Sequence, residues 1–461
     1  MKTVIVIGGG ITGLCTMHYL KRQMEAEGKE AQLILVEQNE YLGGKIHSET
    51  TDGFIMETGA DSIVARHPGV LELVRELEFE EELVYNETGI SYIHTNNELH
   101  AIPAGSTFGI PMSLESLMAS TLISEQGKQR VLQDGTIENT SFTKESSIGA
   151  FLEYFLGEEI VHKQIAPVLA GVYSGDLYQL SLASTLPYLV DYKNEHGSIM
   201  KGFEANRAQF DKAANKKFIS FRKGLSAVID RLEEMLPEVS FKKGVTMKQL
   251  EKSGEHYTLS FANGEQLTAD IVVLAVPNET VRNILTDKEL LLQFEKFTTA
   301  SALTMYLGFD VPDSILPADG TGFIVSENSD LVCNASTWTS RKWKHTSAEG
   351  NLLVRLFYKN INPRYEELAA MTNEELTAVA REDIRRSLGV EDAPKIVNVT
   401  KWIDKMPRYD IAHKEALDAV LKQMDERYPN VLLAGCSYFG VGIGACIANG
   451  KNTAAVIANK L

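Results

Sequence analysis

The feature that most constrains this chain is its beginning, where an apolar run breaks into a cluster of glycines. Residues 2–7 (KTVIVI) end in β-branched side chains, which suit a central parallel strand buried on both faces. Gly8, Gly10 and Gly13 occupy the glycine positions of G-x-G-x-x-G, and a helical pattern continues to about Ala26. These glycines permit a tight turn, close approach of the backbone to a pyrophosphate, and close packing of helix on strand. The stretch therefore predicts a nucleotide-binding βαβ unit whose helix N-terminus receives the diphosphate.

An acidic residue supports this interpretation, because glycine-rich turns alone are common. A second apolar strand, residues 32–36 (QLILV), ends at Glu37. A carboxylate here can accept hydrogen bonds from ribose hydroxyls, and its distance from the glycines is near the usual spacing of about 20 residues. The order of strand, glycines, helix, strand and acid thus predicts a dinucleotide site.

Composition limits the class of protein. The chain has 461 residues, of which 44% are hydrophobic and 23% charged, as in a soluble globular protein of two or three domains. Its net charge of −17 disfavours a nucleic acid or an anionic membrane as the main partner, but leaves an anionic substrate possible. The chain enters a strand without a charged leader or a cleavable apolar segment, so we expect a cytoplasmic protein.

Two further patterns exclude classes of site. The four cysteines, Cys15, Cys333, Cys436 and Cys446, show no C-x-x-C spacing, so neither a disulfide framework nor a zinc site is expected. Residues 431–450 carry no charge and are long enough for a membrane span, but glycines interrupt them at five positions. We interpret them as a strand, a glycine turn and a helix, and predict no transmembrane span. Peripheral membrane contact by the helical insertion described next and the oligomeric state are left open.

Periodicity predicts two insertions in the nucleotide fold. Residues 113–203 have helical patterns, with Ser147 as a cap and a further helix over 180–187 that ends at a proline. Strands are predicted at 301–309, 351–358 and 396–402, with a helix at 373–388, and these strands would form an antiparallel sheet of their own.

The expected fold class is therefore α/β. A Rossmann-like dinucleotide-binding domain would carry an inserted helical subdomain and a mixed α+β substrate domain with an antiparallel sheet. The expected domains are 1–65 with 215–290 and 425–461 for the nucleotide, 104–210 for the helical insertion, and 66–103 with 291–424 for the substrate.

Two motifs that follow the acid carry a resemblance. The chain continues to Gly43-Gly44-Lys45 and then to Gly59-Ala60-Asp61-Ser62. This arrangement resembles the FAD signature of the amine oxidase, phytoene desaturase and protoporphyrinogen oxidase superfamily, in which a glycine pair runs beside the diphosphate. Those proteins usually have arginine where this chain has Lys45, which keeps the charge but lacks the planar fork. The resemblance implies an amine-oxidase-like FAD-binding domain with FAD as the cofactor.

The C-terminal glycine turn, residues 440–444 (GVGIG), opens the last predicted helix. Small residues there would let backbone N–H groups and the positive helix end approach the pyrimidine side of the flavin, where negative charge collects on reduction. A tight packing turn between strand and helix is the alternative.

Three other stretches narrow the resemblance to protoporphyrinogen oxidases. Residues 169–176 (LAGVYSGD) are similar to their A-G-V-Y-x-G-D motif, and 406–409 (MPRY) also fits. Residues 218–225 (FISFRKGL) are similar to F-x-[ST]-[FL]-x-G-G-L, with Lys223 in place of a glycine. The matches span nearly the whole chain, which most resembles the soluble porphyrinogen oxidases of Gram-positive bacteria.

This resemblance implies an oxidoreductase of heme biosynthesis. The flavin N5 would take hydride from a bridging carbon of a porphyrinogen, a pyrrole N–H would lose a proton, and oxygen would reoxidise the flavin to give hydrogen peroxide. Coproporphyrinogen III is preferred as substrate, with protoporphyrinogen IX also plausible. The cofactor carries the redox chemistry, and no catalytic side chain or proton acceptor is identified.

The same resemblance implies site residues. Arg66 matches a propionate-binding arginine, whereas the adjacent His67 is interpreted as a surface residue. Val245 would lie near the adenine, and Trp402 would reach the flavin. The residues expected at the cofactor are Gly8, Gly10, Ile11, Thr12, Gly13, Glu37, Gln38, Gly44, Lys45, Gly59, Ala60, Asp61, Ser62, Val245, Trp402, Val441, Gly442 and Ile443; no metal ligand is expected.

Two rival functions remain. An amine oxidase or a carotene desaturase would use the same FAD fold, but these proteins lack the A-G-V-Y-x-G-D motif. GDP-dissociation inhibitors share the fold, bind no flavin and act only as binding proteins; they should lack the C-terminal glycine contact that this chain has.

Overall fold

The part of the chain that is predicted to bind the nucleotide, called the nucleotide part below, centres on a five-stranded parallel sheet. The computed structural model describes residues 1–461 except 88, 174–175, 212–217, 318, 327 and 411. In the sheet, alternate residues of the middle strand face opposite sides, since Val4 and Val6 belong to one hydrophobic core and Ile5 and Ile7 to another. The strand order is β12 (Ser240–Lys242), β2 (Ala31–Val36), β1 (Lys2–Ile7), β16 (Ile271–Leu274) and β22 (Val431–Leu433).

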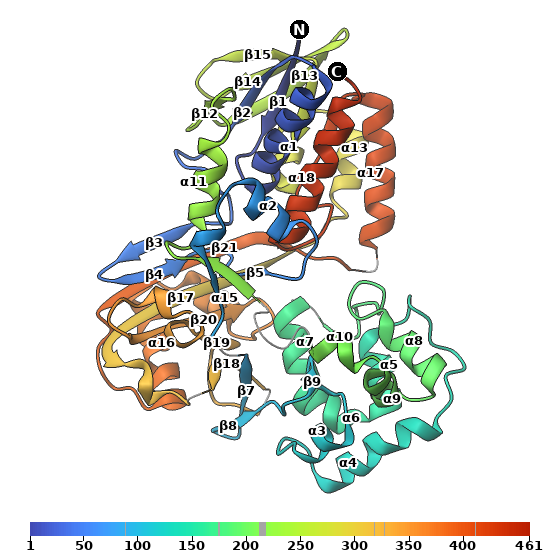
Figure 1. Ribbon diagram of the computed structural model, residues 1–461, viewed down its shortest axis with the longest axis vertical. Coiled ribbons are helices and arrows are strands. Elements are labelled where there is room, and N and C mark those ends of the chain that lie inside the picture. Colours follow the sequence, from blue (N-terminus) through green and yellow to red (C-terminus); the bar gives the residue numbers. More distant parts are fainter. Residues whose placement is uncertain (88, 174–175, 212–217, 318, 327, 411) are drawn as a thin grey trace.

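Helices from distant parts of the chain cover this sheet (Figure 1). One face carries α1 (Ile11–Glu27), α2 (Val70–Glu76), α11 (Ser226–Glu234) and α18 (Ile443–Ala458). The other carries α12 (Asn278–Ile284), α13 (Lys288–Phe294), α17 (His413–Arg427) and the meander of β13 (Met247–Ser253), β14 (His256–Phe261) and β15 (Gln266–Ala269). The two small sheets nearby are β3 (Ser48–Thr51) with β4 (Phe54–Glu57), and β5 (Ile63–Val64) with β11 (Phe218–Phe221) and β6 (Leu83–Tyr85).

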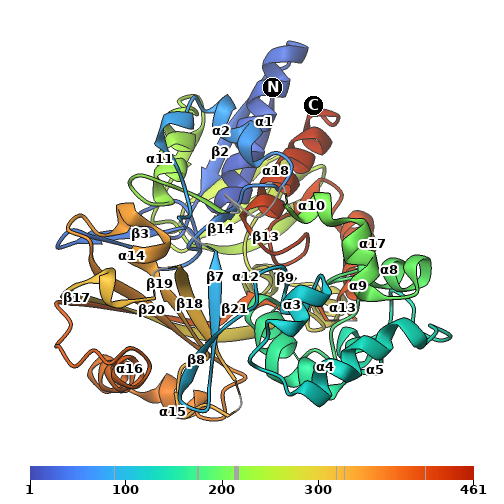
Figure 2. The ribbon, with the colours of Figure 1, turned by 60° about the horizontal axis from the view of Figure 1, so that its bottom comes forward.

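A seven-stranded sheet forms the second part, and α16 covers it (Figure 2). The antiparallel pairing predicted for the strands at 301–309, 351–358 and 396–402 is confirmed, because β17 pairs with β20 and with β21 in this way. Elsewhere in the sheet, β18 pairs with β7 in parallel. Local alternation cannot reveal this pairing, since the two strands are far apart in the sequence. The order is β21 (Ile396–Pro407), β17 (Thr299–Pro312), β20 (Asn351–Lys359), β19 (Ala335–Trp338), β18 (Gly320–Val325), β7 (Ile90–Thr95) and β8 (Glu98–Ala101), with α14 (Thr339–Lys342), α15 (Tyr365–Ala370) and α16 (Asn373–Leu388).

The helical insertion has its own hydrophobic core and lies beside the large sheet (Figure 2). At its centre, Lys193 and Asp134 form an ion pair of 2.8 Å with both side chains 1% exposed. Its elements are β9 (Ser106–Thr107), β10 (Ile110–Pro111), α3 (Leu114–Met118), α4 (Glu125–Leu132), α5 (Ile148–Leu156), α6 (Glu158–Ile160), a π-helical turn (Val161–Ile165), α7 (Ala166–Tyr173), α8 (Tyr188–His196), α9 (Ile199–Ala205) and α10 (Arg207–Asp211).

The structure confirms one prediction about the helices of this region and contradicts another. The Ser147 cap is confirmed, because its side chain accepts a hydrogen bond from the Ala150 N–H. The predicted helix over 180–187 is wrong. Ser181 and Ser184 form a hydrogen-bonded turn instead, and Pro187 precedes α8 rather than ending a helix. The fixed φ of proline suits a helix start as well as it prevents a continuation.

Packing also bears on the expected domain limits, which remain a prediction. Val70, Leu73 and Val74 of α2 join the core around α1 and α18, and Val420 of α17 joins the core on the opposite sheet face. The packing favours placing both helices with the nucleotide part, although the predicted limits assign α2 and most of α17 to the substrate domain. No helix among the described residues has the length and apolar character needed to cross a membrane.

Candidate cofactor and substrate site

The loop between β1 and α1 leaves no room for side chains at two of its glycines. Gly8 has a φ of 107°, and a Cβ there would lie 2.4 Å from a backbone oxygen of the neighbouring strand end. A Cβ on Gly13 would lie 2.1 Å from the Gly8 oxygen. Gly10 differs, because a Cβ there would meet nothing closer than 3.9 Å. Gly10 caps α1 without a side-chain acceptor, so the N–H groups of the first turn, at Ile11 and Thr12, stay available to an anion.

The acid at the end of β2 holds this loop. Glu37 is 6% exposed, and its carboxylate accepts hydrogen bonds from the N–H groups of Gly9 (2.8 Å) and Asn39 (2.9 Å). The Val245 N–H donates to the Glu37 carbonyl at 2.9 Å, while Gln38 beside it is exposed. Ionised carboxylate oxygens have further lone pairs, so Glu37 can still accept from a ribose, and that contact stays a prediction.

The second glycine pair lies directly against the first loop. The Gly43 N–H donates to the Gly9 carbonyl at 2.8 Å, and Gly43 forms a parallel bridge with Gly10. A Cβ on Gly44 would lie 3.3 Å from the Gly10 Cα. The two glycine segments therefore run as adjacent strands of backbone.

Residues 59–62 lie next to this pair through Lys45. The Ala60 N–H donates to the Lys45 carbonyl at 2.9 Å, and a Cβ on Gly59 would lie 2.0 Å from the same oxygen. The Ser62 hydroxyl donates to the Asp61 carboxylate at 3.1 Å. Three motifs separated in the sequence thus meet at one place.

Side chains of the large sheet fasten this segment. Arg355 of β20 is 2% exposed and donates to the Gly59 carbonyl at 2.9 Å. The Trp402 indole N–H of β21 donates to the Thr58 carbonyl at 3.0 Å. Trp402 therefore contacts the predicted cofactor segment, and the large sheet and the nucleotide part meet at these residues.

Asp61 and Lys342 form an ion pair of 2.8 Å in the same region. Burial alone would raise the pKa of Asp61, but the positive charges of Lys342 and Arg355 outweigh it and bring that pKa to about 2. Asp61 is therefore ionised at neutral pH, and its negative charge balances the positive charge of Lys342.

Glu57, just before this segment, is a buried acid in a different state. It is 4% exposed and accepts hydrogen bonds from the Leu225 N–H (2.8 Å) and the Ser48 hydroxyl (2.7 Å). Burial raises its pKa to about 7 in spite of these hydrogen bonds. Glu57 is thus close to half protonated at neutral pH.

The C-terminal glycine turn closes the site from the other side. Gly442 precedes α18 with a φ of 106° and no side-chain cap, and a Cβ there would meet nothing within 4 Å. Val441 is exposed and Ile443 is buried. A Cβ on Gly450 would lie 2.8 Å from the Thr12 carbonyl, so α18 packs tightly on α1, as Figure 1 shows. The uncapped N-termini of two neighbouring helices thus form part of the candidate site.

Tyr409 positions the loop that leads to this turn. Its hydroxyl donates to the Cys436 carbonyl at 2.8 Å and accepts from the Gly440 N–H at 2.7 Å. Its ring packs against the His413 ring, with 3.9 Å between the centroids and the planes tilted by 35°. One side chain therefore holds both ends of the loop.

Arg66 and His67 lie near the start of α18. Arg66 is exposed. His67 is half-buried, and a Cβ on Gly444 would lie 2.4 Å from its ring, so the ring lies against the start of α18. The Nδ1 of His67 donates to the Pro68 carbonyl at 2.8 Å.

The helical insertion contacts the large sheet at the A-G-V-Y motif, whose Ser174 and Gly175 lie outside the described residues. Lys359 of β20 donates to the Gly171 (2.8 Å) and Ala170 (3.2 Å) carbonyls of α7. Burial lowers the pKa of Lys359 to about 8. Lys359 therefore caps the C-terminal turn of α7 and joins the two parts.

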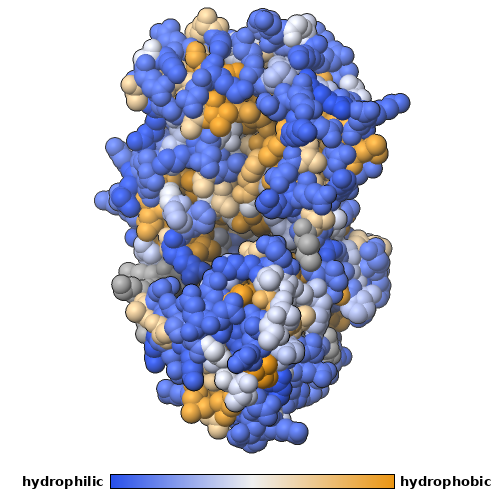
Figure 3. Space-filling view, turned by 90° about the vertical axis from the view of Figure 1, so that its right-hand side faces the viewer, coloured by the Kyte–Doolittle hydropathy of each residue, from blue (hydrophilic) through white to orange (hydrophobic). Residues whose placement is uncertain are grey.

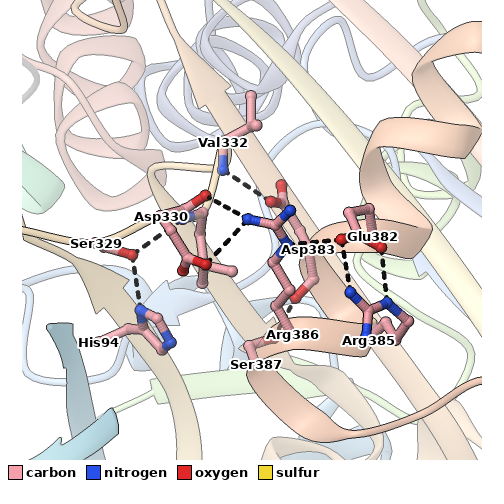
Figure 4. Close-up of polar contacts among 10 residues, drawn as sticks. His94, Ser329, Asp330, Val332, Glu382, Asp383, Arg385, Arg386 and Ser387 are labelled. Carbon is pink, nitrogen blue, oxygen red and sulfur yellow. Dashed lines mark hydrogen bonds and ion pairs between the residues drawn. The ribbon is translucent and has the colours of Figure 1, made fainter. Parts of the chain in front are cut away.

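A separate polar network holds the loop after β18 to α16 (Figure 4). The carboxylate of Asp383, which is 1% exposed, accepts from the N–H groups of Val332 (2.7 Å) and Cys333 (2.8 Å). His94 of β7 lies 2.7 Å from the Ser329 hydroxyl in the same loop. This network supports the part of the sheet where β18 pairs with β7.

The sequence interpretation missed Arg355, Lys342 and Lys359 as residues that position the site. One signal was available, because an arginine inside the apolar run of β20 (NLLVRLFYK) is rarely buried without a specific partner. Lys342 and Lys359 lie at the ends of their elements, and their partners are far away in the sequence, so no local pattern indicates them.

Comparison with protein families gives a match over nearly the whole chain. The profile described as flavin containing amine oxidoreductase matches residues 11–458. The chain is 32% identical over 455 residues to the coproporphyrinogen III oxidase of Bacillus subtilis, with 98% of this chain and 96% of that protein covered. It is 30% identical to the coproporphyrinogen III oxidase of Staphylococcus aureus, with 98% and 97% covered.

Solved structures give the same fold. A proposed protoporphyrinogen oxidase from Exiguobacterium sp. 255-15 superposes with a TM-score of 0.90 at 31% identity, covering 100% of this chain and 99% of that chain. A reduced UDP-galactopyranose mutase gives a TM-score of 0.74 at 15% identity, covering 100% of this chain and 96% of that chain, a similarity that extends to the fold alone.

Proposed function

Because the chain belongs to the flavin containing amine oxidoreductase family, we propose that it is an FAD-dependent porphyrinogen oxidase of heme biosynthesis. The favoured reaction is coproporphyrinogen III to coproporphyrin III, with protoporphyrinogen IX as the second substrate. The observation that carries the proposal is full-length similarity of 30–32% to coproporphyrinogen III oxidases. We place the protein in the cytoplasm.

The residues present fit FAD. The backbone at Gly10 and at Gly442 lies beside open space, and the helices that begin there lack side-chain caps. Free N–H groups at helix N-termini suit a diphosphate and a reduced flavin ring. Glu37 would bind the ribose and Lys45 would lie near the diphosphate.

When bound, the flavin would supply the redox chemistry, taking hydride from a bridging carbon of the substrate and passing electrons to oxygen with release of hydrogen peroxide. The chain would hold the cofactor and orient the substrate. Arg355 and Trp402 hold the backbone at Thr58 and Gly59 in place, and Tyr409 holds the opposite loop.

The substrate combines an apolar macrocycle with carboxylate side chains. Figure 3 shows hydrophobic residues in a hollow between the upper and lower parts of the molecule, a surface that suits the macrocycle. Arg66 is exposed and would pair with one carboxylate, while its neighbour His67 lies against the start of α18.

The test begins with the purified protein, after incubation with FAD and removal of the unbound cofactor. We expect a yellow protein that turns coproporphyrinogen III into a fluorescent porphyrin in air, faster than protoporphyrinogen IX and faster than a reaction without enzyme. A colourless folded protein would overturn every flavoenzyme assignment, including the amine oxidase rival, and would favour a binding protein. Flavin bleaching by amines or carotenes, without bleaching by porphyrinogens, would favour the rival enzymes.

Arg66→Ala tests the substrate contact. Loss of one charge-assisted carboxylate contact should lower kcat/KM by about tenfold, chiefly through KM, with the flavin content unchanged. Arg75→Ala is the matched control, because Arg75 is an exposed arginine on the nearby α2. Equal kcat/KM in the two variants would remove Arg66 from the substrate site.

A further inference from the structure

Two cysteines and a lysine lie together where the chain enters the C-terminal glycine loop. The Sγ of Cys436 is 3.6 Å from the Nζ of Lys45. The thiol of Cys446, in the first turn of α18, is hydrogen-bonded to the Cys436 sulfur. Cys436 is half-buried and Cys446 is 8% exposed, whereas Cys15 and Cys333 are at most 1% exposed.

The surroundings favour the thiolate form of Cys436 and the thiol form of Cys446. The hydrogen bond from Cys446 and the charge of Lys45 lower the pKa of Cys436 below its ordinary value, although burial opposes this. The same hydrogen bond, together with burial, raises the pKa of Cys446. The thiolate is the nucleophilic form of cysteine, so Cys436 is the reactive sulfur and Cys446 is the proton donor beside it.

We propose that Cys436 and Cys446 form a peroxide-sensitive thiol pair, in which Cys436 reacts with hydrogen peroxide and Cys446 then closes an intramolecular disulfide. This assignment goes beyond the proposed function and does not depend on it. It requires only a peroxide small enough to reach the half-buried Cys436.

The steps balance. The Cys436 thiolate attacks one oxygen of hydrogen peroxide, the O–O bond breaks, and hydroxide leaves and is protonated to water, which leaves a sulfenic acid on Cys436. The Cys446 sulfur then attacks the Cys436 sulfur, the S–S bond forms, and the sulfenic oxygen leaves with the Cys446 proton as a second water. Two thiols are oxidised and one peroxide is reduced.

The bond would alter the cofactor side of the molecule. An S–S distance of about 2.05 Å is much shorter than a hydrogen bond between thiols, so the disulfide would join the loop entrance directly to α18. It would also remove a negative charge from beside Lys45, one of the predicted cofactor contacts.

A peptide map tests the pair without an activity assay. Trypsin cleavage after Arg427 and Lys451 releases residues 428–451, which contain Cys436 and Cys446 and neither of the other cysteines. After treatment of the flavin-loaded protein with hydrogen peroxide, this peptide should be lighter by two hydrogen atoms, and dithiothreitol should restore its mass. The thiols titrated after denaturation should fall from four to two.

Variants separate the two roles. Cys446→Ser should stop disulfide closure, so that dimedone traps a sulfenic acid on Cys436. Lys45→Met should slow alkylation of Cys436 near neutral pH several-fold, because a less stabilised thiolate is less populated. Cys333→Ser is the control and should leave the mass change intact. A peptide of unchanged mass in peroxide-treated wild type, or a Cys446→Ser protein without a dimedone adduct, would overturn the proposal.

Discussion

The buried carboxyl of Glu57 should make this protein less stable as the pH rises from about 4.5 to about 7. Burial raises its pKa from 4.5 to about 7, so between these values the folded chain binds a proton that the unfolded chain has released. The stabilisation is therefore fully present below pH 4.5 and is lost as the pH rises through 7. A shift of about 2.5 pH units, at about 1.4 kcal/mol for each, corresponds to a total loss of about 3.5 kcal/mol.

Glu57→Gln isolates this effect, because the amide cannot ionise and nearly matches the protonated acid in shape. The free energy of unfolding of the variant, minus that of the wild type, should increase by about 3 kcal/mol between about pH 4.5 and pH 7. Urea titrations at several pH values measure both terms. Glu374→Gln on the exposed face of α16 is the control and should show no such trend. A difference that stays constant across this range would refute the burial argument.

Three other substitutions test the contacts that hold the site and the helical insertion. Arg355→Met removes the 2.9 Å hydrogen bond to the Gly59 carbonyl, an interaction of about 1.5–3 kcal/mol. The Kd for flavin, measured by titrating flavin-free protein, should therefore rise at least tenfold. An unchanged Kd would show that residues 58–62 do not take part in cofactor binding. Tyr409→Phe keeps the ring but loses both hydrogen bonds to the loop. We expect a loss of about 1–2 kcal/mol in the free energy of unfolding, and faster flavin release in stopped-flow dilution. Wild-type values for both quantities would show that the loop does not need this hydroxyl. Lys193→Met leaves Asp134 buried without its partner and should cost about 3–5 kcal/mol, seen as a lower Tm by calorimetry; a Tm equal to that of the wild type would contradict the buried-pair argument.

The nucleotide-binding entry could be predicted from the sequence because its signals are local. The β-branched run of β1, the glycines before α1 and the acid after β2 follow one another within 37 residues, and each has a direct physical reason. The helix predicted at 373–388 is likewise confirmed as α16. Its N-terminus has a capping box between Thr372 and Glu375, a signal contained within one turn.

The one helix prediction that failed, and the contacts that were not predicted, concern choices that local sequence does not decide. Pro187 suits the first turn of a helix as well as the end of one, and only the hydrogen-bonded turn at Ser181 distinguishes the two. The parallel pairing of β7 with β18 joins residues more than 200 positions apart. Arg355 meets Gly59, and Lys45 meets Cys436, only in the folded chain, so these contacts could not be predicted from spacing.

The packing of α18 on α1 has a consequence for how the chain is made. During synthesis α1 leaves the ribosome more than 400 residues before α18. The apolar side of α1, including Leu14 and Cys15, is therefore not covered by α18 until the end of the chain has been made. Long-range pairing of this kind is slow and exposes surface that chaperones bind. A chain truncated before Ile443 would therefore lose one wall of the candidate cofactor site rather than a dispensable tail. Capture of the cofactor is thus tied to completion of translation.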